Sequence, residues 1–166
     1  VLQADDVLRD FDGNVLILCG DVPLLLSSTI EGLLENHRSN SAAITVMTAI
    51  LDDPGSYGRI VKNEEGDVLK IVEARDAGAE EKMIKEINTG IYCAENAFLF
   101  EAVRKIDNKN AQGEYYFTDI FEIARGENRK TGSFIIDDPS EAMGINTADD
   151  LKTAERIMRK MGADSI

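Results

Sequence analysis

The sequence predicts an α/β fold in which helices flank both faces of a mixed, mainly parallel sheet. The apolar run Val15-Leu16-Ile17-Leu18 is too short for a typical helix and is followed by Gly20, Asp21 and Pro23. Such a run is typical of a strand buried on both faces. A second buried strand is expected at residues 42–51, which are apolar and rich in β-branched side chains. The residues between them have helical spacing, which completes a strand-helix-strand unit with a right-handed crossover.

The helix of this unit is expected to begin at Ser28, which forms a capping-box pattern with Glu31. His37, the only histidine, lies near its end and is interpreted as a structural or dipole-complementing residue rather than a catalyst. The later segments alternate between strand and helix patterns. They are a hairpin at 59–62 and 68–72, a short helix or flexible excursion at 77–85, a strand at 87–93, a helix from Asn96, a short helix at 118–125, a strand at 133–136 and a final helix opened by 147–150.

Composition excludes several classes of partner. The formal net charge of -13 argues against nucleic acid or an anionic membrane, although not against a nucleotide held by a metal and backbone amides. No apolar run approaches membrane-spanning length, and nothing at the start resembles a signal peptide. Cys19 and Cys93 are too few for a disulfide framework or a zinc site. They are interpreted as small apolar residues in a reducing cytoplasm.

Asp21 is the first candidate for chemistry. It lies just past the carboxyl end of the first expected strand, where open α/β sheets bind their ligands. Gly20 allows a sharp turn there, and Pro23 prevents the strand from continuing as a central one. A carboxylate in this position suits Mg²⁺, which is usually held by one or two carboxylates and substrate phosphates. A turn aspartate is the commoner explanation of a lone Gly-Asp pair.

Further polar residues stand at expected strand ends and turns, and each has a simple structural explanation when taken alone. Gly58 and Asn88 are common in plain turns, and Glu73 would lie at a solvated strand end. Tyr116 would be a core aromatic residue whose hydroxyl contacts water, and Asn146 would simply precede the last helix. The segments that contain them are Tyr57-Gly58-Arg59-Ile60, Ile71-Val72-Glu73, Glu86-Ile87-Asn88-Thr89-Gly90-Ile91, Asn110-Ala111-Gln112-Gly113-Glu114-Tyr115-Tyr116-Phe117-Thr118-Asp119 and Gly144-Ile145-Asn146.

Together with Gly20-Asp21-Val22-Pro23-Leu24, these ordered segments resemble the motifs of the sugar nucleotidyltransferases. The resemblance is strongest to the uridyltransferase domain of the bacterial bifunctional N-acetylglucosamine-1-phosphate uridyltransferase/glucosamine-1-phosphate acetyltransferases. It implies a nucleotide-diphospho-sugar transferase-like (Rossmann-like) fold and a cytoplasmic enzyme of peptidoglycan precursor synthesis for the cell wall. The implied reaction is Mg²⁺-dependent uridylyl transfer from UTP to N-acetylglucosamine 1-phosphate, which gives UDP-N-acetylglucosamine and pyrophosphate.

The same resemblance implies roles for individual residues. Asp21 and Asn146 would be the catalytic residues, because they would hold the Mg²⁺ that bridges the phosphates. Such transfer requires little acid-base assistance, since a sugar phosphate is already an ionised nucleophile. The substrate-binding residues would be Cys19, Gly20, Asp21, Gly58, Glu73, Asn88, Tyr116, Thr118 and Asn146.

Two motifs of this family do not occur in the sequence: the Gly-rich phosphate-cradling loop and the segment that reads uracil. Residues 1–166 are therefore expected to form a single partial nucleotidyltransferase domain, with the sugar- and metal-binding portion but without the amino-terminal nucleotide-binding part. We expect the chain alone to be inactive. We also expect a homo-oligomer, formed through the sheet edge that the missing part would cover.

Two other functions remain compatible with the residues. One is a nucleotidyltransferase that uses a different sugar phosphate. The other is a non-catalytic sugar-binding or assembly module, which the absence of the nucleotide-binding motifs favours.

Overall fold

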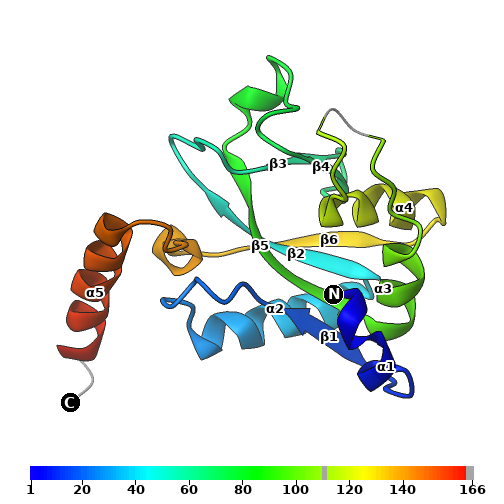
Figure 1. The fold of residues 1–166 in the computed structure, drawn as a ribbon, viewed down its shortest axis with the longest axis horizontal. Helices are drawn as coiled ribbons and strands as arrows, with labels where there is room; N and C mark the ends of the chain where they lie inside the picture. Colours follow the sequence, from blue (N-terminus) through cyan, green and yellow to red (C-terminus); the bar gives the residue numbers. More distant parts are fainter. Residues whose placement is uncertain (110–111, 164–166) are drawn as a thin grey trace.

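A six-stranded mixed sheet forms the centre of the protein in a computed structural model, which describes residues 1–109 and 112–163 (Figure 1). Its main path has the order β4-β3-β5-β2-β6, and β1 pairs with β5. The strands are β1 (Asn14–Ile17), β2 (Ile44–Ile50), β3 (Arg59–Lys62), β4 (Val68–Val72), β5 (Glu86–Glu95) and β6 (Thr131–Ile135). The helices are α1 (Asp5–Leu8), α2 (Ser27–Asn40), α3 (Asn96–Val103), α4 (Ile120–Gly126) and α5 (Ala148–Ala163), with 3₁₀ turns η1 (Leu2–Ala4), η2 (Glu81–Met83), η3 (Phe117–Asp119) and η4 (Pro139–Ala142).

The strand directions confirm a mixed sheet, but the expectation that it is mainly parallel is wrong. Among the described strands, only β2 and β6 pair in parallel, whereas the β1–β5, β2–β5, β3–β4 and β3–β5 pairs are antiparallel. β1 and β2 do run in the same direction, as expected of a strand-helix-strand unit. However, they do not pair with each other, because β5 lies between them. β5 runs in the opposite direction and pairs with each of them in antiparallel fashion.

Two apolar clusters cover the two faces of this sheet. On one face, Leu33 of α2 packs with Met47 and Ala49 of β2 and Ile91 of β5. On the other face, Ile44 and Val46 pack with apolar residues of α3 and α4. Residues of β2 thus alternate between the two clusters, as the pleat of a strand requires. The expected helices on both faces are therefore confirmed (Figure 1).

β1 is less buried than its apolar sequence suggests. Its four residues are all half-buried, and Leu18, just beyond its end, is 48% exposed. Val15 and Ile17 pack against one apolar cluster and Leu16 packs against the other, so both faces of β1 contact the core, but the full burial expected from the sequence is incorrect. Among the described residues, only β5 pairs with β1. The expected association of copies through the sheet edge remains a prediction.

The start of α2 also differs from expectation. The helix begins at Ser27, and no local side-chain hydrogen bond caps it, so the capping box expected at Ser28 and Glu31 does not form. Instead, the backbone N–H of Leu26 donates a 3.1 Å hydrogen bond to the carboxylate of Glu141, which is buried. A carboxylate at a helix N-terminus satisfies a free amide and complements the helix dipole. The distant η4 segment therefore supplies the cap.

His37 has the structural role that the sequence predicts. It is 1% exposed, and its Nδ1 lies 2.9 Å from the hydroxyl of Thr45 on β2. Burial lowers the pKa of His37 from its ordinary value of 6.5, so the buried ring is neutral near pH 7. No helix of the described residues is long and apolar enough to cross a membrane.

The neutral burial of His37 predicts a pH-dependent stability. Because its pKa is lower in the folded state, the unfolded chain binds a proton first as the pH falls below about 6.5. The contribution of His37 to the free energy of unfolding is therefore complete above that pH and is lost below it. In urea denaturation at pH 7.5 and 5.5, the wild type should lose more stability than His37→Gln. Equal losses would show that His37 is not buried as the neutral ring.

Candidate functional site

The segment that follows β1 carries Asp21 and is held in place by a segment far along the chain. The backbone N–H of Ile145 donates a 2.9 Å hydrogen bond to the carbonyl oxygen of Asp21. The predicted motif Gly144-Ile145-Asn146 is therefore brought directly against Asp21, although the sequence separates them widely.

The side chains of Asp21 and Asn146 converge at Gly144. A Cβ atom at Gly144 would lie 3.5 Å from Asp21 Oδ2 and 3.6 Å from Asn146 Nδ2. The absence of a side chain at Gly144 thus leaves space beside both groups. Rotation of the Asn146 carboxamide would bring its oxygen to the place of its nitrogen, so the pair can present two oxygen ligands to a hard cation.

A resident Mg²⁺ would fit this pair. In the described part of the chain, no three His, Cys, Asp or Glu residues are arranged to hold a metal. Mg²⁺ typically keeps several waters and takes one or two protein carboxylates together with substrate phosphates. A site with one carboxylate and one carboxamide is therefore suited to a Mg²⁺ whose remaining ligands are waters or phosphate oxygens.

The backbone of Asn146 is fixed by the start of α5. The carboxylate of Asp150 accepts hydrogen bonds from the N–H groups of Asn146 at 3.1 Å and Thr147 at 2.8 Å. The Thr147 hydroxyl accepts one from the N–H of Asp150 at 3.2 Å. Hydrogen bonding to the Thr147 side chain, followed by the two backbone amides, lowers the pKa of Asp150. The carboxylate therefore stays ionised and continues to hold the turn that presents Asn146.

A second group of predicted residues surrounds a hollow of about 430 Å³ between the end of β4 and the segment before α4. Glu73 and Tyr116 line it, and the buried Thr118 lies behind Glu73, with its Oγ1 donating a 3.3 Å hydrogen bond to Glu73 Oε1. Desolvation raises the pKa of Tyr116, and the neighbouring carboxylates, including Asp76, raise it further. Asn110 and Ala111, which begin the expected motif, lie outside the described residues. The hollow is lined by Ser56, Glu73, Ala74, Arg75, Glu114 and Tyr116.

Asn88 and Gly58 form the third part of the site. The N–H of Asn88 donates a 2.9 Å hydrogen bond to the carbonyl oxygen of Gly58. A side chain at position 58 would meet Ile71 at 3.3 Å and the Cβ of Asn88 at 3.4 Å, so glycine permits this close approach. The Asn88 Oδ1 accepts two hydrogen bonds, each 3.0 Å long, from the N–H of Gly90 and the hydroxyl of Tyr92.

Cys19 joins the Asp21 segment to β5. Its Sγ lies 3.4 Å from the carbonyl oxygen of Gly90, and a Cβ at Gly90 would come within 2.9 Å of that sulfur. Gly90 also has a φ of +80°, which disfavours any other residue. Gly20 lies in the adjoining turn, where a Cβ would meet nothing within 4 Å. Cys93 is a small core residue as expected, whereas Cys19 is an exposed residue whose Sγ packs against Gly90.

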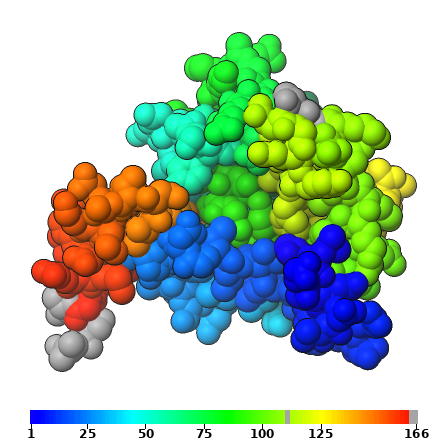
Figure 2. Space-filling view, in the orientation of Figure 1, coloured from blue at the N-terminus to red at the C-terminus, as the bar shows by residue number. Residues whose placement is uncertain are grey.

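The contact between Cys19 and Gly90 connects the segment that carries Asp21 with Asn88 on β5. Strand β3 then lies between β5 and β4, and Glu73 directly follows β4. Figure 2 shows a hollow on this face of the molecule, with the green of β5 at its floor. The blue segment after β1, the orange segment before α5 and the yellow-green segment before α4 border it.

Three supporting residues were not predicted from the sequence. Tyr92 orients the side chain of Asn88, and Glu141 binds the start of α2. Arg59 is buried, and its guanidinium donates hydrogen bonds to the carbonyl oxygens of Tyr57 and Gly55. Arg59 therefore fixes the loop that precedes Gly58. Only Tyr92 had a signal in the sequence: it follows Asn88 by four residues in an expected strand, where alternation places both residues on one face.

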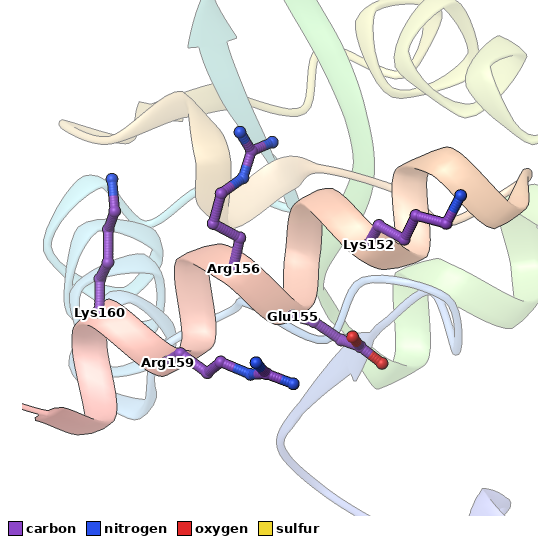
Figure 3. Close-up of a pocket in the computed structure, with 5 residues that line it drawn as sticks. All are labelled: Lys152, Glu155, Arg156, Arg159 and Lys160. Atoms are coloured by element: carbon purple, nitrogen blue, oxygen red, sulfur yellow. The ribbon is translucent and has the colours of Figure 1, made fainter.

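A separate hollow of about 390 Å³ runs along α5 and is less suited to catalysis. Its lining side chains all come from this one helix. Figure 3 shows Lys152, Arg156 and Lys160 on one side of α5, and Glu155 and Arg159 on another. They diverge rather than converge, so they form a basic surface on an acidic protein and not an enclosed site.

Comparison with known proteins places the sequence among enzymes of one kind. The family described as nucleotidyl transferase matches residues 1–144. Proteins named "Bifunctional protein GlmU" are similar over 96% of the chain: that of Geobacillus thermodenitrificans is 48% identical, that of Acetivibrio thermocellus 46% and that of Geotalea daltonii 49%. The chain spans about a third of the length of these curated relatives, with 35%, 34% and 35% covered.

Solved structures support the fold independently. A Bacillus anthracis protein described as a glucose-1-phosphate thymidylyltransferase matches 96% of the chain and 61% of its own, with a TM-score of 0.64 and 22% identity. A CMP:2-keto-3-deoxy-manno-octonic acid synthetase matches 94% of the chain and 66% of its own, with a TM-score of 0.64 and 14% identity. At these identities the likeness concerns the fold.

The position of Cys19 beside Asp21 predicts a specific pattern of thiol reactivity. Partial burial, followed by the negative charge of Asp21, raises the pKa of Cys19, while burial raises that of Cys93 to about 11. Only the thiolate reacts with iodoacetamide, so Cys19 should react more slowly than free cysteine at pH 7, and Cys93 hardly at all. Asp21→Asn should accelerate alkylation of Cys19, as measured by peptide mass spectrometry. The distant Glu65→Gln serves as the control, and an unchanged rate in Asp21→Asn would contradict the placement.

Proposed function

Because this chain belongs to the nucleotidyl transferase family, we propose that it supplies the sugar- and metal-binding part of an enzyme that transfers a uridylyl group. In the proposed reaction, a phosphate oxygen of N-acetylglucosamine 1-phosphate attacks the α-phosphorus of UTP. A new P–O bond forms, the bond to the β-phosphate breaks, and pyrophosphate leaves. The names of the relatives, the convergence of Asp21 with Asn146 and the hollow lined by Glu73 and Tyr116 support this proposal.

The cation end of the site would be held by Asp21 and Asn146. A bound Mg²⁺ would neutralise phosphate charge and act as a template for the two anionic substrates. The chain itself fixes both ligands before any substrate binds: Ile145 holds the backbone of Asp21, and Asp150 holds that of Asn146. Such preorganisation reduces the entropy that must be lost when the reacting groups are aligned.

The sugar end of the site would use hydrogen bonds of both polarities. Glu73, fixed by Thr118, can accept from sugar hydroxyls, and Asn88 can donate to them. Gly58 brings a backbone amide close to Asn88, while the half-buried Tyr116 offers an aromatic face and a hydroxyl. Together these groups suit a polar ring with several hydroxyls and an acetamido substituent.

This mechanism requires no basic side chain to activate a nucleophile. The sugar phosphate is ionised at neutral pH, and catalysis of phosphoryl transfer depends on position and charge neutralisation. The one histidine, His37, is buried against Thr45 and does not face the site. The chemistry therefore depends on the paired Asp21 and Asn146 and on the sugar pocket.

The test uses the full protein that carries this chain, assayed for pyrophosphate release from UTP and N-acetylglucosamine 1-phosphate with Mg²⁺. Asp21→Ala and Asn146→Ala should each reduce turnover by roughly 10²-fold or more, as is typical when a transition-state charge loses a stabilising group. Both should also weaken Mn²⁺ binding measured by electron paramagnetic resonance. Gly144→Ala should weaken it too, because its methyl group would contact both side chains.

Glu65→Ala, in the exposed turn after β3, is the matched control and should retain activity. Near-normal turnover in Asp21→Ala or Asn146→Ala would refute the metal assignment. Preference for glucose 1-phosphate over the N-acetylated sugar would favour an enzyme for another sugar phosphate. Sugar binding without any turnover in the full protein would favour a non-catalytic module.

A further inference from the structure

The hydrogen bonds around Asn88 assign a fixed polarity to its side chain. The N–H of Gly90 is a donor under all conditions, so the atom that it contacts must be the oxygen of the Asn88 carboxamide. The Tyr92 hydroxyl reaches the same oxygen at 3.0 Å and must therefore donate as well. An amide oxygen has two lone pairs, and these two donors occupy both of them.

The opposite end of the carboxamide remains for a ligand. Among residues 1–109 and 112–163, Asn88 Nδ2 has no hydrogen-bond partner, and the side chain is only half-buried. An amide nitrogen donates and does not accept. Asn88 can therefore meet a bound sugar only as a donor, so the sugar must present an acceptor atom there.

The packing of Tyr92 holds its hydroxyl in position to donate to Asn88. It is 4% exposed, and its ring packs edge-on against Phe117 at a centroid distance of 5.0 Å and lies beside Phe121 at 6.2 Å. Phe117 stands between Tyr116 and Thr118 in the sequence, so the same ring also supports the segment that lines the sugar pocket. Burial raises the pKa of Tyr92 well above its ordinary value, and the hydroxyl remains a donor at any pH used in an assay.

The backbone geometry of β5 makes this contact possible. Asn88 and Tyr92 lie four residues apart on β5 with Gly90 between them, and the Tyr92 hydroxyl reaches the oxygen of the Asn88 side chain. Gly90 has a φ of +80° and contacts Cys19, so no larger residue fits there. The β2–β5 register is also irregular opposite this stretch, between Val46 and Thr48.

We propose that Tyr92 is a positioning residue for the sugar site. Its hydroxyl fixes the orientation of the Asn88 carboxamide, so that the amide nitrogen can only donate, in a one-way donor role, to an acceptor oxygen of the sugar. This inference rests on the proposed function, because it requires Asn88 to contact the sugar phosphate. Glu73 lines the hollow as an acceptor, and it directly follows Val72, which approaches Gly58 as Asn88 does. A sugar hydroxyl, which can accept from one group and donate to another, is the ligand group that suits Asn88 and Glu73.

Tyr92→Phe tests the proposal because it retains the ring and its packing and removes only the hydroxyl. In the full protein, we expect the KM for N-acetylglucosamine 1-phosphate to rise about 5-fold, as for the loss of one neutral hydrogen bond, with kcat and the KM for UTP unchanged. Calorimetric titration with N-acetylglucosamine 1-phosphate should show the same loss of affinity. Tyr115→Phe, whose side chain is 72% exposed, is the matched control and should behave as wild type.

A double-mutant cycle shows whether Tyr92 acts through Asn88. Asn88→Ala should weaken sugar-phosphate binding about 10-fold or more, and adding Tyr92→Phe to it should have no further effect. An additional loss in the double variant, or an equal rise in the KM of both substrates, would overturn the positioning role. If Asn88→Ala weakens binding but Tyr92→Phe does not, the inference fails and the proposed sugar site stands. If Asn88→Ala itself binds normally, the proposed sugar site fails.

Asn88→Asp tests the donor polarity without relying on Tyr92. Aspartate keeps an oxygen that accepts from Gly90 and Tyr92, but it cannot donate from its other oxygen when ionised. It should therefore bind N-acetylglucosamine 1-phosphate as poorly as Asn88→Ala does, with an unchanged melting temperature. Affinity close to that of wild type in Asn88→Asp would overturn the one-way donor role.

Discussion

The hydrogen-bonded stretch of β5 from Asn88 to Tyr92 is the constraint on which the candidate site depends. Gly90, with its positive φ, gives its N–H to Asn88 and brings its carbonyl oxygen to the thiol of Cys19. The same few residues therefore orient Asn88, which belongs to the proposed sugar site, and contact the segment that carries Asp21. A change in this part of the backbone would therefore affect both the Asn88 side chain and the segment that leads to Asp21.

The remaining groups are held by contacts between segments that are distant in the sequence. Ile145 fixes the backbone of Asp21, and Glu141 satisfies the first free amide of α2, so residues 141–146 support the loop after β1 from both of its ends. Thr118 fixes Glu73 in the same manner. Loops that carry functional groups gain precision when a rigid scaffold positions them. Here the scaffold is a sheet with an apolar cluster on each face.

Much of this arrangement could be predicted from local sequence patterns. Apolar periodicity located the strands and helices, and the ordered motifs identified Asp21 and Asn146, which the fold brings together. Strand direction could not be predicted, because it depends on β5 lying between β1 and β2. The cap of α2 was also misplaced, since a buried carboxylate from Glu141 replaces the local Ser28–Glu31 pattern. Tyr92 was missed because an aromatic residue in an expected strand is usually a core residue, and its hydrogen bond to Asn88 is seen only in the folded strand.

The most direct test of this account is the distance between the cation and the sugar phosphate when both are bound. If Asp21 and Asn146 hold a cation beside the sugar pocket, Mn²⁺ should strongly broaden the ³¹P resonance of N-acetylglucosamine 1-phosphate bound to the full protein. Asp21→Ala should abolish that broadening at the same Mn²⁺ concentration, while the sugar phosphate stays bound. A sharp ³¹P signal in the wild type with Mn²⁺ bound, or equal broadening in Asp21→Ala, would contradict the joint metal and sugar site.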